Sequence, residues 1–250
     1  MENVEIYLDS DVTADDILEF GSEHIVLSTG SSWRRDGVSR HHLSPQVFPE
    51  SLVFTPDDIF SGRIPSGRVV VYDDDHFYLG GVLAEYCRKN GCEVTLITPA
   101  AVVSSWTVHT LEQETIQADL LKKGIKILPH HFVRPGQKTN PEAVHIYTES
   151  VPYEAKFLDC SALVLVTARL PNSGLESALE AVRNSWDEAG IKSVTRIGDA
   201  LAPATIAAAV YSGHRYAREL DEDIDPDAVP FERELIEIAA EPDWETFWLE

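Results

Sequence analysis

The chain has 250 residues, 44% of them hydrophobic and 25% charged, which is enough to bury the core of one large domain or two small ones. Its formal net charge of −22 would repel a phosphate backbone, so we exclude nucleic acid as a partner and interpret the excess carboxylate as a source of solubility. No apolar run approaches the roughly 20 residues that span a bilayer, and the N-terminus does not resemble a signal peptide, so we expect a cytoplasmic protein with no membrane partner.

The first part of the chain mixes short elements with a long connection. Alternating residues at 4–8 predict a strand, and Thr13 is a suitable N-cap for a short helix. The apolar segment 24–28 predicts a buried strand. Polar clusters and scattered prolines from 34 to about 65 predict a long connecting loop with one short helix near 55–58.

From residue 67 strands and helices alternate regularly. Strand 68–72, a helix over about 78–90 and strand 93–97 form one βαβ unit. Apolar residues at helical spacing predict a second helix over about 111–123, which is followed by strand 125–128.

The remainder continues the alternation. Residues 144–147 predict a strand of a small meander, and 161–167 predict another buried strand. A helix over 175–189, a strand at 194–197 and a helix from about 203 to 220 complete the predicted elements.

Alternating strands and helices predict an α/β fold with largely parallel sheets. We expect two Rossmann-like lobes, the second inserted in the first. The boundaries predicted are 67–158 for the inserted, NAD(P)-binding-like domain, and 1–66 with 159–250 for the discontinuous, FAD/ADP-binding-like domain.

The strongest local feature is a strand that runs through Gly198 and Asp199 into a helix preceded by Pro203. Free backbone N–H groups at a helix start can bind a pyrophosphate. In that interpretation Gly198 approaches a nucleotide and Asp199 binds a ribose or ribityl hydroxyl. The alternative, which remains open, is that Asp199 only caps the helix.

A second glycine turn, at Thr29 and Gly30, follows the strand at 24–28. It is similar to the turn beside the adenine nucleotide in flavoproteins with two dinucleotide domains. A strand that ends in Thr-Gly is more often ordinary turn chemistry, and only its pairing with the Gly198 element favours a binding role.

An acidic turn, Asp73 to Asp75 followed by His76, occupies the place where a dinucleotide-binding unit would carry G-x-G-x-x-G. Carboxylates there would repel phosphate, so we predict that this unit does not bind NAD(P)H. A metal site at the same turn is an alternative, but we favour helix capping and predict no metal ligands.

The sequence also indicates no catalytic residue. His41–His42 and His130–His131 are adjacent pairs without the i, i+4 spacing of helical metal ligands, and we interpret them as surface histidines. There is no G-x-S-x-G elbow, and the three cysteines form no C-x-x-C pair, which argues against a disulfide framework and a zinc site.

Three stretches, 70–85, 93–100 and 197–219, resemble the C-terminal region of the trimethylamine, dimethylamine and histamine dehydrogenases, within the wider NADH:flavin oxidoreductase and 2,4-dienoyl-CoA reductase-like flavoproteins. The resemblance implies a TIM barrel with FMN and a [4Fe–4S] cluster, followed by two domains similar to the FAD and NADPH domains of glutathione reductase. It also implies bound ADP or FAD and electron transfer to an electron-transfer flavoprotein.

This sequence departs from the family because it begins after the barrel, the cluster cysteines and the first glycine-rich strand of the ADP-binding domain. FMN and [4Fe–4S] are therefore expected only in the missing barrel. The residues that the resemblance assigns to nucleotide binding are Thr29, Gly30, Gly198, Asp199, Ala200, Thr205 and Ile206.

These observations favour a non-catalytic part of an enzyme that oxidises a methylated amine or related compound. The alternatives are a separately encoded nucleotide-binding subunit that pairs with a barrel-bearing partner, and an NAD(P)H-dependent reductase domain. We interpret Trp244, Phe247 and Trp248 as a domain or subunit contact, and expect the isolated chain to form a homo-oligomer or to aggregate.

Overall fold

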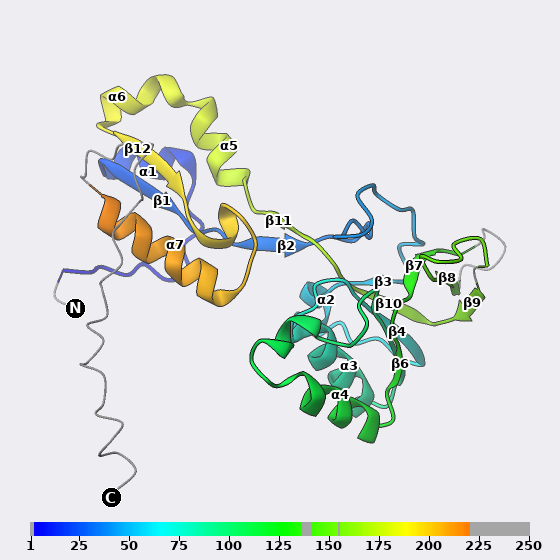
Figure 1. Cartoon of the computed structure of the whole chain (residues 1–250). Helices are drawn as coiled ribbons and strands as arrows, with labels where there is room; N and C mark the ends of the chain where they lie inside the picture. The colour runs from blue at the N-terminus through cyan, green and yellow to red at the C-terminus, as the bar shows by residue number, and fades with distance from the viewer. Residues whose placement is uncertain (1–2, 137–141, 155, 221–250) are drawn as a thin grey trace, which may run out of the picture. The chain divides into compact units, whose positions relative to one another are not determined.

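A computed structural model describes residues 3–136, 142–154 and 156–220 (Figure 1). The chain divides into two compact units. Unit 1 combines Met1–Ser28 with Leu175–Glu250, and unit 2 is the continuous segment Thr29–Gly174.

Unit 2 is built on a parallel sheet of five strands. In order across the sheet these are β3 (Val53–Phe54), β10 (Ala162–Val166), β4 (Arg68–Asp73), β5 (Glu93–Ile97) and β6 (Lys126–Leu128). The prediction of a mixed α/β fold with a largely parallel sheet is confirmed.

The central strands are continuously apolar because both faces of the sheet are covered. Val69 and Val71 of β4 belong to one core, whereas Val70 and Tyr72 belong to the other. All five residues of β10 are buried. A strand exposed on one face would instead alternate between apolar and polar residues.

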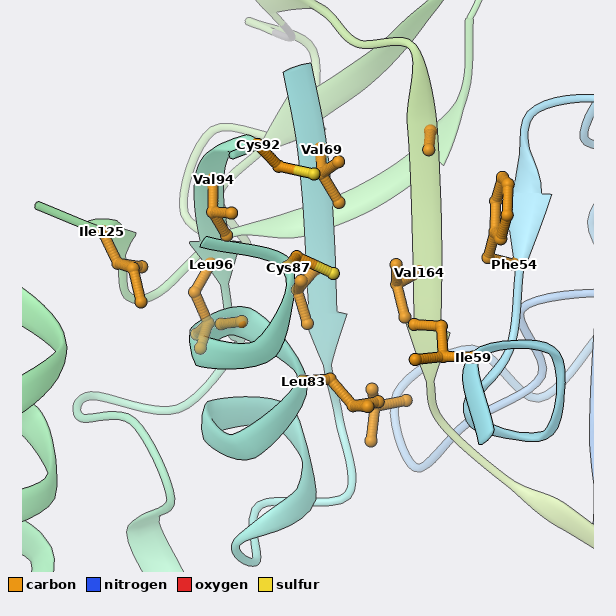
Figure 2. Close-up of a cluster of buried hydrophobic side chains, with 14 of the residues drawn as sticks. Phe54, Ile59, Val69, Leu83, Cys87, Cys92, Val94, Leu96, Ile125 and Val164 are labelled. Carbon is orange, nitrogen blue, oxygen red and sulfur yellow. The ribbon is translucent and has the colours of Figure 1, made fainter. Parts of the chain in front are cut away.

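Helices of unit 2 contribute to the first of these cores. They are α2 (Pro56–Phe60), α3 (Leu79–Lys89) and α4 (Gln113–Lys122), whereas the short 3₁₀ helix η1 (Ser105–Val108) supplies no residue to it. Leu83 and Cys87 of α3 share this core with the strand residues Val69 and Val164 (Figure 2). Thr55 caps α2 through a reciprocal capping box with Asp58.

The second core is completed by an antiparallel meander of β7 (Phe132–Pro135), β8 (Ala143–Tyr147) and β9 (Lys156–Asp159). Val133 and Val144 of the meander pack in one cluster with Leu163 and Leu165 of β10. Unit 2 also contains an antiparallel pair, β2 (Ser31–Trp33) with β11 (Arg169–Pro171).

Unit 1 has a smaller core cluster than unit 2. Its described residues include one parallel pair of strands, β1 (His24–Leu27) and β12 (Ser193–Arg196). Its other elements are α1 (Ala14–Phe20), α5 (Gly174–Ala181), η2 (Arg183–Ser185), α6 (Trp186–Ala189), η3 (Gly198–Ala200) and α7 (Ile206–Glu219). Five buried residues among those described form its core cluster, Ile17, Leu27, Leu179, Trp186 and Ile191, and Ala200 is buried outside that cluster.

Two predicted elements of unit 1 differ from the structure. Residues 4–8 form no strand, and the apolar side chains in that segment, such as Ile6 and Leu8, are exposed because no neighbouring strand pairs with them among the described residues. The helix predicted over 175–189 is broken into α5, η2 and α6. Trp244, Phe247 and Trp248 lie outside the described residues.

The boundaries between the units also lie elsewhere than predicted. The expected limits at 66/67 and 158/159 would have cut through the five-stranded sheet, because β3 precedes residue 67 and β10 follows residue 158. The boundaries lie at 28/29 and 174/175 instead. Hydrogen bonding of β10 between β3 and β4 is the physical reason.

Among the described residues, no helix combines the length and the apolar character that crossing a bilayer requires.

Candidate functional site

The predicted pyrophosphate element lies in unit 1, where β12 leads through η3 into α7. Gly198 adopts a left-handed φ of +57°, which a residue with a side chain rarely takes. Its N–H donates to Ser212 Oγ at 3.0 Å, and a Cβ at this position would lie 3.5 Å from Ala209 Cβ. Gly198 therefore lets the strand turn close to the surface of α7.

Asp199 and Thr205 both accept backbone hydrogen bonds in the turn before α7. Asp199 Oδ1 accepts from Ala204 N–H at 3.1 Å, and the Thr205 side chain accepts from Ala208 N–H at 3.4 Å. The N-cap of α7 is thus Thr205, and Asp199 orders the loop that leads to it. The helix begins at Ile206, three residues after the predicted start at Pro203.

The remaining predicted residues of this element differ in exposure. Ala200 is fully buried, whereas Ile206 is 85% exposed at the start of α7. Gly198, Asp199, Ala200, Thr205 and Ile206 are brought together within one turn of unit 1.

The second predicted turn belongs to unit 2. Thr29 Oγ1 donates to the Asn172 carbonyl at 2.6 Å, and Asn172 Nδ2 donates to the Thr29 carbonyl at 3.0 Å. Gly30 has a φ of +73°, and its carbonyl accepts from Asn172 N–H at 2.9 Å. These contacts extend the β2–β11 pair, so both residues have a local structural role.

The acidic turn after β4 is filled by its own side chains. Asp73 and Asp74 are both fully buried. Asp73 Oδ1 accepts from the N–H groups of Asp75 and His76 at 3.1 and 3.0 Å. A Cβ added at Gly80 would lie 2.4 Å from Asp73 Cγ, so the carboxyl occupies the space between β4 and the start of α3.

The helix-capping interpretation of this turn was wrong. α3 begins at Leu79 with Tyr78 as N-cap, without a side-chain cap or an acidic residue in its first turn. The Asp73 carboxylate instead stabilises the turn by accepting hydrogen bonds from its backbone N–H groups. Burial raises the pKa of Asp73 to about 6, although hydrogen bonds from the turn backbone and the nearby His76 oppose that shift.

The first histidine pair is also not a pair of free surface residues. His41 Nδ1 lies 2.7 Å from Asp74 Oδ1, although the ring is partly exposed. His42 Nε2 lies 2.8 Å from the Tyr147 hydroxyl, and burial lowers the pKa of His42. Adjacent histidines in a predicted loop carried no signal for these partners, which lie more than 30 residues away in sequence.

The cysteines are poor candidates for nucleophiles. All three are free and buried. Burial raises the pKa of Cys87 to about 11 and of Cys160 to about 12, and also raises the pKa of Cys92. Thiolates, the reactive form, are therefore scarce at neutral pH.

One groove of about 480 Å³ in unit 2 lies at the amino ends of the parallel strands, beside Arg68, Glu93 and Lys126. Ligands of open α/β sheets bind at the opposite, carboxyl edge. The acidic turn, which directly follows β4, lies at that carboxyl edge.

Comparisons with known proteins identify relatives of the chain. Residues 54–158 match the family model described as the OYE-like second alpha/beta domain. Dimethylamine dehydrogenase of Hyphomicrobium sp. (strain x) is 31% identical across 89% of this chain and 33% of its own length.

Two solved structures agree with that match. Histamine dehydrogenase from Rhizobium sp. 4-9 is 44% identical, with a TM-score of 0.87 over 95% of this chain and 36% of that protein. The 6-hydroxypseudooxynicotine amine oxidase of Pseudomonas geniculata N1 is 36% identical, with a TM-score of 0.78 over 86% of this chain and 31% of that protein. The chain thus spans about a third of these relatives, and the resemblance seen in the sequence is confirmed.

Proposed function

Because the chain is homologous to the dimethylamine and histamine dehydrogenases of the trimethylamine dehydrogenase family, we propose that it is the nucleotide-binding-like, C-terminal portion of a flavin oxidoreductase that oxidises a methylated amine or a related compound. In this proposal FMN and a [4Fe–4S] cluster, both in a separate barrel domain, would supply the redox chemistry. An electron-transfer flavoprotein would be the electron-accepting partner. The present chain supplies no catalytic residue.

The observation that carries the proposal is the filled turn after β4. A dinucleotide-binding unit carries glycines at this turn, so that no side chain separates the backbone from the pyrophosphate. In this chain Asp73 and Asp74 fill that space, and Asp73 closes the gap to Gly80. The buried side chains and their negative charge both oppose the binding of NAD(P)H at this turn. This supports a function in which the amine, and not NAD(P)H, is the electron donor.

For unit 1 we propose a half-site for ADP or FAD, on a fold related to the FAD domain of glutathione reductase. The first N–H groups of a 14-residue helix such as α7 lack intrahelical partners and favour an anion. Gly198 gives the backbone a close approach to that end, and the Asp199 carboxylate can accept a hydrogen bond from a sugar hydroxyl. Thr29 and Gly30 belong to unit 2 and are a separate, weaker candidate for a nucleotide contact.

A binding experiment tests this half-site. The purified chain is denatured, any released nucleotide is identified by chromatography, and the native chain is titrated calorimetrically with ADP, FAD and NADH. We expect ADP or FAD to bind and NADH to give no heat. Asp199→Ala should weaken ADP binding at least tenfold, whereas Asp187→Ala, an exposed acid in α6, should leave it unchanged.

A second experiment addresses the electron donor of the whole enzyme. The intact protein that contains this chain is mixed anaerobically with a methylated amine or with NADH, and flavin bleaching is followed. We expect bleaching by the amine alone. Rapid reduction of the flavin by NADH would overturn the proposal. A change in that rate in Asp73→Gly would then show whether NADH binds at the acidic turn.

A further inference from the structure

His41, Asp74 and His76 converge at the carboxyl edge of the unit 2 sheet. His41 Nδ1 lies 2.7 Å and His76 Nε2 lies 3.0 Å from the same carboxylate oxygen, Asp74 Oδ1. One ligand atom from each residue lies within 4.8 Å of the other two. Two imidazole nitrogens and a carboxylate oxygen thus lie close together.

The backbone holds two of these groups rigidly. Asp74 follows β4 directly, and its N–H donates to the Val166 carbonyl of β10 at 2.9 Å. His76 has a left-handed φ of +69°, which is unfavourable for a residue with a side chain. Its N–H is held by the Asp73 carboxyl at 3.0 Å, and this turn directs the ring toward Asp74. Strain of this kind persists where the surroundings impose it, often at functional positions.

A second layer of contacts orients the three side chains. Thr98 Oγ1 lies 3.4 Å from His76 Nδ1, which leaves Nε2 to face Asp74. Asp74 Oδ2 accepts from the His41 N–H at 3.1 Å, so Oδ1 is the oxygen directed to the two rings. Outer contacts of this type fix the ring orientation and tautomer in metal centres.

The separations suit a small divalent ion. With ligand bonds of ~2.0–2.1 Å and tetrahedral angles, ligand atoms lie roughly 3.3 Å apart. The N···O separations of 3.0 and 2.7 Å would therefore lengthen by about 0.3 and 0.6 Å, and the two imidazole nitrogens, which lie within 4.8 Å of each other, would take the same spacing. Asp74 is fully buried and the His76 side chain is 7% exposed, whereas the His41 side chain is 43% exposed and leaves an entry path for an ion and a water ligand.

We propose that His41, Asp74 and His76 bind a divalent transition-metal ion of the zinc class, with water as the fourth ligand. Two imidazoles and one carboxylate are a ligand set that suits zinc, whereas calcium and magnesium prefer oxygen ligands alone. The ion would join the loop that carries His41 to the end of β4. The proposal concerns this chain alone and does not depend on amine oxidation or nucleotide binding.

The test uses the full chain after removal of metals by a chelator. Zinc is added in competition with a chromophoric chelator, and cobalt(II) serves as a spectroscopic probe. We expect one zinc per chain and cobalt absorption typical of nitrogen and oxygen ligands. His41→Ala should weaken zinc binding at least tenfold, and His109→Ala, an exposed histidine of the same unit, should leave it unchanged.

His76→Asn provides a second variant, because asparagine tolerates a left-handed φ but cannot place a nitrogen where Nε2 lies. It too should lose zinc affinity at least tenfold while circular dichroism shows an intact fold. Absence of stoichiometric zinc binding would overturn the proposal. Unchanged affinity in both ligand variants, or a cobalt–thiolate charge-transfer band, would do the same, since the ion would then lie elsewhere.

Discussion

The two units differ in how completely they bury their own sheets. In unit 2 five parallel strands carry an apolar core on each face, and the central strands are almost fully inaccessible. In the part of unit 1 that the structure describes, a single pair of strands supports one small cluster, and α7 has no buried residue. A pair of strands alone is marginal in water, whereas a sheet covered on both faces is not.

Apolar surface is also exposed among the described residues of unit 1. A groove of about 640 Å³ beside α1 is lined by Tyr7, Val12, Phe20 and Ile25, among others. Large exposed apolar patches mark interaction surfaces or aggregation-prone regions. The comparison indicates that the two apolar cores of unit 2 are sufficient for it to fold by itself. We propose that unit 1 gains part of its stability from a partner surface or from a second copy of the chain.

The largest expected effect comes from one truncation made in each core. Leu163 and Leu179 are both completely buried, and Leu→Ala in a core costs about 2–5 kcal/mol. Leu163→Ala should weaken unit 2 but leave it folded. Leu179→Ala should unfold unit 1, because its single cluster has little stability in reserve. Hydrogen exchange followed by mass spectrometry reports on each unit separately.

For Leu179→Ala the decisive measurement is the protection of the β1 and β12 backbone amides from hydrogen exchange. For Leu163→Ala it is the protection of the β10 amides. If β1 and β12 stay protected in Leu179→Ala while β10 loses protection in Leu163→Ala, the order of stability is the reverse of the one inferred here.

A smaller effect is expected from adding one methyl group to each of two helical glycines. Gly80→Ala places a Cβ against the buried Asp73 carboxyl and should destabilise unit 2 by about 1–3 kcal/mol. Gly174→Ala, at the start of α5, meets no atom within 4 Å and should be neutral or stabilising by up to about 1 kcal/mol. Denaturant unfolding measures both. Equal effects would show that the turn after β4 is less tightly packed than its distances indicate.

The smallest effect compares the two capping boxes, Thr55–Asp58 in unit 2 and Thr13–Asp16 in unit 1. Burial raises the pKa of Asp58, but hydrogen bonds from Thr55 and the Arg35 guanidinium outweigh it and the net pKa is lowered. Ionised Asp58 therefore stabilises the fold above the ordinary carboxyl pKa, and this contribution is lost as the pH falls through the lowered value.

Asp58→Asn should accordingly cost about 0.5–2 kcal/mol at pH 7 and less in acid, below the ordinary carboxyl pKa. Asp16→Asn should cost less at either pH, because Asp16 has no arginine partner in its capping box and is exposed to solvent. Thermal unfolding across this pH range checks both variants. A loss for Asp58→Asn that is independent of pH would mean that shape, not charge, is what the carboxylate contributes.

Most elements of unit 2 were predictable because local patterns determine them. Apolar runs at 68–72, 93–97 and 161–167 predicted β4, β5 and β10, and Thr13 and Thr55 lie at helix starts as polar caps should. Their neighbours in the sheet were not predictable. β10 pairs with β4 across some 90 residues, and a run of buried valines carries no information about which strand lies beside it.

The candidate sites show the same division. The place of Gly198 between a strand and a helix was expected, and the structure adds its positive φ. The cluster of His41, Asp74 and His76 was not, because its members come from a long loop and a turn, and no periodicity connects them. The acidic turn was judged by charge alone, and its burial, which decides what the carboxylates do, follows from packing against Gly80.

The position of β10 has a consequence for the order in which the protein folds during synthesis. β10 is made after β4, β5 and β6 but lies between β3 and β4, so β3 has no strand partner until residue 166 has left the ribosome. β1 waits longer still, since His24 meets Ser193 at a separation of 169 residues. Pairings this distant close slowly and leave sheet edges open in the meantime. We therefore expect the nascent chain to complete the five-stranded sheet of unit 2 first and the β1–β12 pair of unit 1 last.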